Sequence, residues 1–132
     1  MPASLTLDLL ETPLVILRLD AGAAIPEWTA KAVHFLTISR MPTELSIVAD
    51  AAAVPSQILP DRYYRAFRVR GPLPLDLVGV FAVMAGPLAT AGIPIFPIAT
   101  FDTDYLLVEV ADVPRATKAL LAAGHQVERA SG

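Results

Sequence analysis

The stretch that decides the fold runs from residue 64 to residue 81 and is YRAFRVRGPLPLDLVGVF. Its first residues alternate, with Phe67 and Val69 on one side and two arginines on the other, which predicts a β-strand with one buried face. The segment GPLP then ends the strand, because glycine and proline favour turns. From Leu77 onward apolar residues recur at intervals of three or four, which predicts an amphipathic helix with Asp76 as its N-cap.

Strand and helix patterns continue toward the C-terminus. The further predicted elements are strands at residues 93–98, 105–110 and 126–128 and a second helix at residues 112–124. The order strand, helix, strand, strand, helix, strand predicts an α+β fold of the ferredoxin-like βαββαβ type. In this fold both helices cover one face of a four-stranded antiparallel sheet.

Three prolines modify this prediction. Pro94 and Pro97 confine the strand at 93–98 to a sheet edge, since neither residue can donate to a ladder, and their spacing predicts a local bulge. Pro87 is expected to kink or break the first helix near its end, because proline removes a backbone donor and clashes with the preceding turn.

The N-terminal half also contains strand patterns, but no pair of long helices. Its predicted strands are residues 5–9, 14–19, 35–40 and 45–49. We interpret residues 1–60 as a degenerate N-terminal copy of the same unit and residues 61–132 as the complete C-terminal one. Strand exchange between the two halves is an alternative, with Leu5–Leu10 as the candidate segment.

The composition indicates an interface. Of 132 residues, 55% are hydrophobic and only 17% are charged, and the mean hydropathy is +0.56. A chain this short cannot bury so much apolar surface alone, which predicts a homodimer with two-fold symmetry. The net charge of −3 and the ten scattered basic residues argue against nucleic acid as a partner. The absence of cysteine excludes disulfides and thiolate chemistry.

One long uncharged segment resembles a membrane span in length. The 25 residues from Leu77 to Phe101 carry no charge, which is long enough to cross a bilayer, but glycines and prolines divide the segment. The N-terminus carries Asp8 and Glu11 and no early Lys or Arg, unlike a secretion signal. We therefore expect no membrane association and a cytoplasmic protein.

Several ordered motifs carry a family resemblance. Phe67–Leu73, residues 76–80 and above all Ala99–Val108, followed by Ala123–His125, resemble a bacterial family of tandem ACT-domain proteins. The resemblance covers roughly residues 44–126. That family is similar to the regulatory ACT region of aspartate kinases and to the cytosolic arginine sensor of the TOR pathway. The resemblance implies tandem ACT-like units, a regulatory role without catalysis, and an amino-acid ligand held between ACT units.

The resemblance and the residues themselves point to the same two turns. In the sensor, a Thr–Phe pair and an Asp three residues later lie in the arginine pocket, and they correspond to Thr100, Phe101 and Asp104. Free backbone N–H groups at the start of the helix near Leu77 suit a ligand carboxylate, and acidic side chains suit its ammonium group. The predicted ligand site consists of Asp76, Leu77, Val78, Gly79, Thr100, Phe101, Asp102 and Asp104.

Other interpretations of these residues remain open. Asp76 alone has the chemistry of a helix cap, Gly79 of a packing residue, and the pair Asp102 and Asp104 of a solvated turn. A catalytic or metal-binding role for that pair is disfavoured, because no third acidic residue or histidine lies nearby in the sequence. We predict no catalytic residue, no metal site and no cofactor. The competing hypothesis is a protein–protein interaction module without a small ligand.

Overall fold

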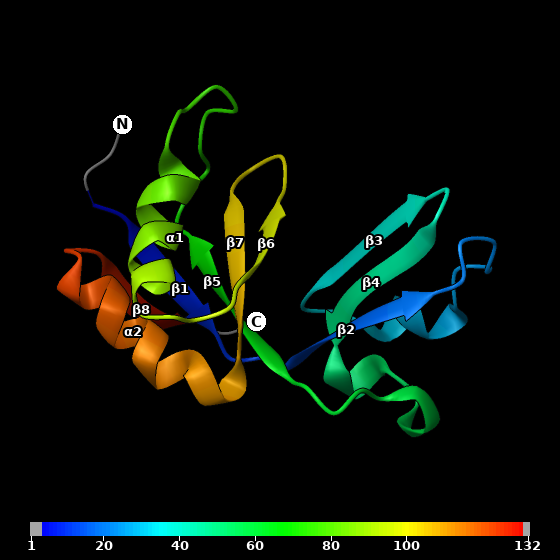
Figure 1. Cartoon of the computed structure of the whole chain (residues 1–132). Helices are drawn as coiled ribbons and strands as arrows, with labels where there is room; N and C mark the ends of the chain where they lie inside the picture. The colour runs from blue at the N-terminus through cyan, green and yellow to red at the C-terminus, as the bar shows by residue number, and fades with distance from the viewer. Residues whose placement is uncertain (1–3, 131–132) are drawn as a thin grey trace. The chain divides into compact units, whose positions relative to one another are not determined.

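The computed structural model describes residues 4–130, which divide into two compact units (Figure 1). Residues up to Glu11 and from Arg65 onward form one unit, which we call the split unit. Residues Thr12–Tyr64 form the other, which we call the inserted unit. The chain thus enters the inserted unit after its first strand and returns to the split unit at the start of β5.

The split unit is an α+β fold of five strands and two helices, which confirms the predicted fold class. Its elements are β1 (Thr6–Leu10), β5 (Tyr64–Val69), α1 (Val80–Thr90), β6 (Phe96–Ala99), β7 (Asp104–Glu109), α2 (Val113–Ala122) and β8 (Gln126–Ala130). A 3₁₀ turn, Val110–Asp112, leads into α2. The strand order is β8–β1–β5–β7–β6, and both helices lie on one side of the sheet in Figure 1.

Strand β1 lies inside this sheet, between the first and last strands of the βαββαβ order. It pairs antiparallel with β5, where Leu7 faces Val69, and parallel with β8, where Leu7 faces Val127. The prediction of a four-stranded, wholly antiparallel sheet was therefore wrong. The physical reason is burial, because Leu7 is fully buried and Leu5 and Leu9 nearly so in the core under the helices.

Helix α1 differs from its prediction at both ends. It begins at Val80 rather than Leu77, and its N-cap is Gly79, whose φ of 84° is the left-handed conformation that favours glycine. The prediction of Asp76 as the N-cap was wrong, since Asp76 lies in the exposed loop before that turn. The helix also continues past Pro87 to Thr90 instead of breaking there.

A buried histidine compensates for the donor that Pro87 lacks. In an ideal helix the N–H of residue 87 would donate to the carbonyl of Val83. Here the Nε2 of His125 lies 2.8 Å from that carbonyl oxygen, and its Nδ1 lies 3.0 Å from the backbone nitrogen of Leu5. Because the Leu5 N–H can only donate, Nδ1 is the acceptor, and the ring proton on Nε2 donates to Val83. One side chain thus links α1, the start of β1 and the start of β8.

Strand β6 forms one edge of the sheet, as the prolines predicted, but it is shorter than expected. It begins at Phe96, so that Pro94 lies outside it and only Pro97 remains within. Its register with β7 is continuous, from Phe96 opposite Leu107 to Ala99 opposite Asp104. The prediction of a bulge was therefore wrong, because Pro94 lies outside β6 and takes no part in its pairing with β7.

The inserted unit is a three-stranded antiparallel sheet with short 3₁₀ turns. Its strands are β2 (Leu14–Leu19), β3 (Leu36–Met41) and β4 (Glu44–Asp50), in the order β3–β4–β2. The 3₁₀ turns are Glu27–Lys31, Ala51–Ala53 and Ser56–Ile58. Val15, Leu45 and Ile47 are fully buried, with Trp28 packed against them. That this unit is a degenerate copy of the other stays a prediction.

A buried carboxylate organises the start of β3. Asp50 is only 4% exposed, and it accepts the backbone N–H groups of His34 at 3.1 Å and Phe35 at 2.8 Å. These bonds satisfy the buried carboxylate and fix where β3 begins.

Among the residues that the structure describes, no helix is long and apolar enough to cross a membrane.

Candidate functional site

A cavity of about 190 Å³ opens in the split unit between the β5–α1 loop and the β6–β7 turn. It is lined by Leu73, Pro74, Leu75, Leu77, Val80, Ala99, Thr100, Phe101, Asp102, Thr103 and Asp104. Five of the eight predicted site residues are in this lining: Leu77, Thr100, Phe101, Asp102 and Asp104. The other three, Asp76, Val78 and Gly79, are not. Of the residues predicted on the loop side only Leu77 lines the cavity, and a ligand site here stays a prediction.

Hydrogen bonds within the β6–β7 turn hold the polar wall of the cavity. The carbonyl of Thr103 accepts the backbone N–H of Thr100 at 2.9 Å and its hydroxyl at 3.1 Å. The buried hydroxyl of Thr103 in turn donates to the carbonyl of Val69 at 2.6 Å. The Thr100 hydroxyl is therefore already engaged in shaping the turn, and Asp102 and Asp104 from this segment line the cavity.

The opposite wall is tied directly to that turn. The backbone N–H of Leu73 donates to the carbonyl of Asp102 at 2.7 Å. Gly71 lets the two segments approach closely, because a Cβ at this position would lie 3.1 Å from the Leu73 nitrogen and 3.2 Å from the Asp102 oxygen. Loop and turn therefore form a pre-formed cleft, since both walls are fixed by backbone contacts.

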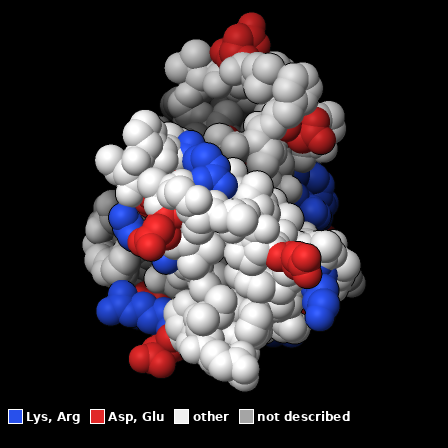
Figure 2. All heavy atoms as spheres, turned by 90° about the vertical axis from the view of Figure 1, so that its right-hand side faces the viewer, with Lys and Arg blue, Asp and Glu red and all other residues white. Residues whose placement is uncertain are grey.

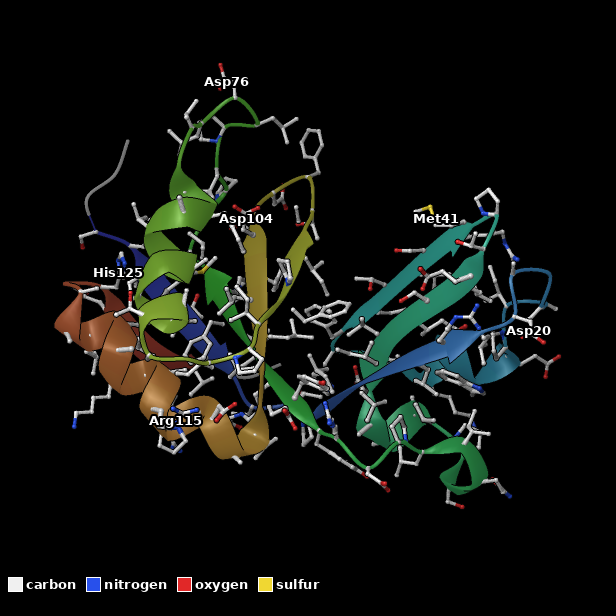
Figure 3. The ribbon with its side chains drawn as sticks, in the orientation of Figure 1. Asp20, Met41, Asp76, Asp104, Arg115 and His125 are labelled. Atoms are coloured by element: carbon white, nitrogen blue, oxygen red, sulfur yellow. The ribbon has the colours of Figure 1, made fainter. Side chains whose placement is uncertain are left out.

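The start of α1 contributes differently from what the sequence predicted. The N–H of Leu77 is not free, because it donates to the carbonyl of Pro74 at 3.1 Å. Val80, the first residue of the helix, lines the cavity instead, and no side chain caps this end of the helix. The positive end of the helix dipole therefore adjoins the cavity. Asp76 points away from Asp104 at the tip of its loop (Figure 3).

The cavity combines an acidic wall with an apolar one. Asp102 and Asp104 are its only charged lining residues among those described, so its side-chain charge is negative. The rim is unusually apolar, since Leu75 is 70% exposed and Phe101 77% exposed. Such an arrangement can receive a cationic group beside the aspartates, an anionic group at the helix end, and an apolar body between them.

The sequence did not identify the lining residues before the helix. The sequence predicts only a strand stop at Gly71–Pro74 and assigns no role in a ligand site to Leu73, Pro74 or Leu75. The available signal was the alternation Pro72-Leu73-Pro74-Leu75, because the prolines stop the strand while the two leucines carry apolar side chains into a surface loop.

Arg68 in β5 and Arg70 just after it form salt bridges within the split unit. The Nη2 of Arg68 lies 3.3 Å from Asp8, and Arg70 contacts both Asp8, at 2.5 Å, and Glu128, at 3.2 Å. Hydrogen bonding to Arg70 lowers the pKa of Asp8 below its usual value, against the opposing effect of burial. These partners give the arginines a structural role.

Within residues 4–130, no cluster of three or more His, Asp or Glu side chains suits a metal ion.

Comparison with known proteins identifies the split unit. The family model of the ACT domain matches residues 60–122, and a second model, which describes an N-terminal domain, matches residues 15–57. The solved structure of an Agrobacterium tumefaciens protein is 34% identical, with a TM-score of 0.85 over 96% of this chain and 94% of that one. The chain is an ACT-domain protein.

Two larger proteins also resemble this ACT-domain protein, one in sequence and one in fold. Cytosolic arginine sensor for mTORC1 subunit 1 of Homo sapiens is 35% identical over 97 residues, which cover 67% of this chain but only 29% of the sensor. The aspartate kinase of Clostridium acetobutylicum, an allosteric enzyme, shares the fold, with 12% identity and a TM-score of 0.59. That match covers 85% of this chain and 33% of the kinase.

Proposed function

We propose that this ACT-domain protein is a non-catalytic regulatory protein that binds a small ligand, an amino acid, in the cavity beside α1. The observation that carries the proposal is that Leu77, Phe101, Asp102 and Asp104 line one cavity. Its volume of about 190 Å³ is below the range of drug-sized pockets, which favours a ligand as small as one amino acid. The similarity to an arginine sensor supports the same ligand class.

An amino acid complements each part of the lining. Its carboxylate would lie at the uncapped N-terminus of α1, near Val80, where backbone N–H groups and the helix dipole favour an anion. Its ammonium group, or a basic side chain, would lie beside Asp102 and Asp104. Its apolar part would contact Leu73 and Phe101, and the ring of Phe101 can also attract a cation through its face. Because both charged side chains are acidic, we expect basic amino acids to bind best.

Binding would act by favouring one arrangement of the loops. A ligand that contacts both the β5–α1 loop and the β6–β7 turn stabilises the conformation in which the two segments lie together. The population of that conformation then rises, and so does any activity that depends on it. We propose further that the protein acts as a homodimer in the cytoplasm, since its low charge content and high hydropathy favour an interface.

A thermal-shift screen tests the proposal. The twenty amino acids, together with citrulline as the uncharged analogue of arginine, are added to the folded protein at millimolar concentration. A ligand present at about a hundred times its dissociation constant stabilises the folded state by roughly 2.7 kcal/mol, which gives a clear shift in Tm. Arginine or lysine should stabilise the protein more than citrulline. A flat screen on well-folded protein would rule out an amino-acid ligand.

Two variants locate the site. Asp104→Asn keeps the shape of the side chain but removes its charge, and we expect it to weaken binding about 10- to 150-fold, as for loss of a charge-assisted hydrogen bond. Asp76→Asn is the matched control, because Asp76 is also an aspartate near the same loop but does not line the cavity. Equal effects of the two variants would contradict this location.

The apolar rim favours a second candidate function. Leu75 and Phe101, which line the cavity, are each at least 70% exposed, which is typical of a surface that another protein covers. In that case the protein is an interaction module without a ligand. The two functions differ in the screen, since only ligand binding raises Tm with an amino acid.

A further inference from the structure

A second cavity of the split unit lies on the face of its sheet that the helices do not cover. Phe67 and Val69 are buried in the core beneath the helices, so strand alternation turns Arg68 to the opposite face. The cavity has a volume of about 380 Å³, within the usual range of small-molecule pockets. Every residue that lines it belongs to the split unit, among them Asp8, Arg68, Arg70, Pro72, Thr103 and Tyr105.

Charged side chains gather at this cavity, although the chain has few of them. Only 17% of its residues are charged, and uncharged atoms cover most of the described surface on the face shown in Figure 2. The cavity is nevertheless lined by two arginines, Arg68 and Arg70, and two aspartates, Asp8 and Asp102. These charges balance, so the cavity has no strong positive field for a multiply charged anion such as phosphate. A ligand must therefore be recognised by a particular group rather than by net charge.

The two arginines of the cavity differ in how they are held. Arg70 contacts Asp8 through Nε at 3.4 Å and Nη2 at 2.5 Å, and Glu128 through Nη1 at 3.2 Å, so each of its nitrogens has a partner. The guanidinium of Arg68 has one contact among the described residues, from Nη2 to Asp8 at 3.3 Å, and its side chain is 36% exposed. Because Arg70 already contacts both oxygens of Asp8, Arg68 is the arginine that retains N–H groups for a ligand.

We propose that this cavity binds a small molecule with a single carboxylate, which Arg68 holds through two parallel hydrogen bonds. One contact with Asp8 leaves a complete edge of the planar guanidinium, and a carboxylate fits such an edge with both oxygens. A second negative charge on the ligand is disfavoured, because Asp102 lines the same cavity. Pro72 and the ring of Tyr105 supply apolar surface for the body of the ligand.

This site is separate from the cavity beside α1. The two linings share only Asp102 and Thr103, and Arg68 belongs to the second cavity alone. The carboxylate site therefore does not rest on the binding of an amino acid beside α1, and a flat thermal-shift screen with amino acids leaves it standing.

Isothermal titration calorimetry tests the ligand class. Acetate, pyruvate and benzoate are titrated into the full chain at pH 7 beside their uncharged amides. We expect at least one of these carboxylates to bind with a dissociation constant on the order of 1 mM, and its amide to bind about tenfold more weakly or less. Phenyl phosphate, which carries a second charge, should bind no more tightly than benzoate. Failure of all three carboxylates to bind, equal binding of the amides, or tighter binding of the phosphate overturns the proposal.

Substitutions of arginine test the role of Arg68. Arg68→Gln should weaken binding of the carboxylate about tenfold or more. Arg68→Lys keeps the charge but lacks the planar fork, so it should also weaken binding. Arg129→Gln is the matched control, because Arg129 is an exposed arginine of the same unit that lines neither cavity. Undiminished binding by Arg68→Gln, or an equal loss in Arg129→Gln, contradicts the assignment.

Nuclear magnetic resonance locates the ligand without any variant. In the ¹⁵N-labelled chain, the carboxylate that binds in calorimetry should shift the backbone amide signals of Gly71 and Tyr105, which line only the second cavity. The signals of Leu77 and Val80, which line only the cavity beside α1, should stay in place. Shifts at Leu77 and Val80 without shifts at Gly71 and Tyr105 overturn the proposed location.

Discussion

The contact of His125 with the proline-containing helix permits a quantitative test by a double-mutant cycle. His125→Phe keeps an aromatic ring of similar size but removes both ring nitrogens. It leaves the Leu5 N–H and the Val83 carbonyl without their partner, and His125 itself is only 4% exposed. Each unsatisfied buried group costs about 1–3 kcal/mol, so the variant should lose roughly 2–6 kcal/mol of unfolding free energy.

The second substitution separates the two bonds. Pro87→Ala restores an N–H that can donate to the Val83 carbonyl within α1. In this background His125→Phe should cost only about 1–3 kcal/mol, because the Leu5 N–H alone is left unsatisfied. The cycle therefore predicts a coupling free energy of about 1–3 kcal/mol between positions 87 and 125, although they are distant in sequence.

The chain provides separate optical probes for its two units. Both α-helices belong to the split unit, so circular dichroism at 222 nm follows its unfolding in urea. The only tryptophan, Trp28, belongs to the inserted unit and packs in its core. His34→Phe is the comparison for the inserted unit: it removes the contact of His34 Nδ1 with Asp50 at 3.0 Å, so its effect should appear in the Trp28 signal. Additive effects of the 87 and 125 substitutions, within 0.5 kcal/mol, would refute the proposed role of His125.

Two further predictions concern the split unit. Because the pKa of Asp8 is lowered in the folded state, its ion pairs stabilise the fold above pH 4, and this stabilisation is lost as the pH falls through the folded-state pKa. Asp8→Asn should therefore lower the free energy of unfolding by roughly 1–2 kcal/mol at pH 7. In urea titrations between pH 7 and pH 3, this variant should lose less stability than the unaltered protein. Gly71→Ala should destabilise the protein by about 1–3 kcal/mol in thermal unfolding, since the added Cβ would meet backbone atoms of both cavity walls. Gly86→Ala is the control: its added Cβ would have no atom within 4 Å, and it should stabilise α1 by about 0.5–1 kcal/mol. A stabilising Gly71→Ala, or equal acid sensitivity of Asp8→Asn, would contradict these contacts.

The order of elements from β5 to β8 was predictable because each carries a local signal. Alternation marks β5, the three-to-four spacing marks α1, and proline and glycine mark the ends of the helices. The position of β1 was not predictable in the same way. Its alternating leucines predict a strand, but they do not predict which strands it pairs with. Its pairing with β5 and β8 depends on the burial of Leu7 against residues far along the chain, which no local pattern shows.

The candidate site was predictable in part for a similar reason. Thr100–Asp104 form a self-contained turn, and their chemistry and sequence order identify them together. The other wall depends on the path of a loop. Asp76 has good N-cap chemistry, but the left-handed conformation at Gly79 places the start of the helix at Val80, which leaves Asp76 outside. Val80, the first residue of the helix, is packed in the core, which fits this later start.

The interleaved path of the chain has a consequence for its synthesis. All three strands of the inserted unit lie between residues 14 and 50, so a ribosome releases them together, and they can pair while translation continues. Strand β1 emerges earlier but needs β8, whose residues end at 130. At about 5–20 residues per second, roughly 6–24 s separate the two. Within that interval β1 can pair with β5 once residues 64–69 have emerged, but its other edge stays unpaired until β8 is made.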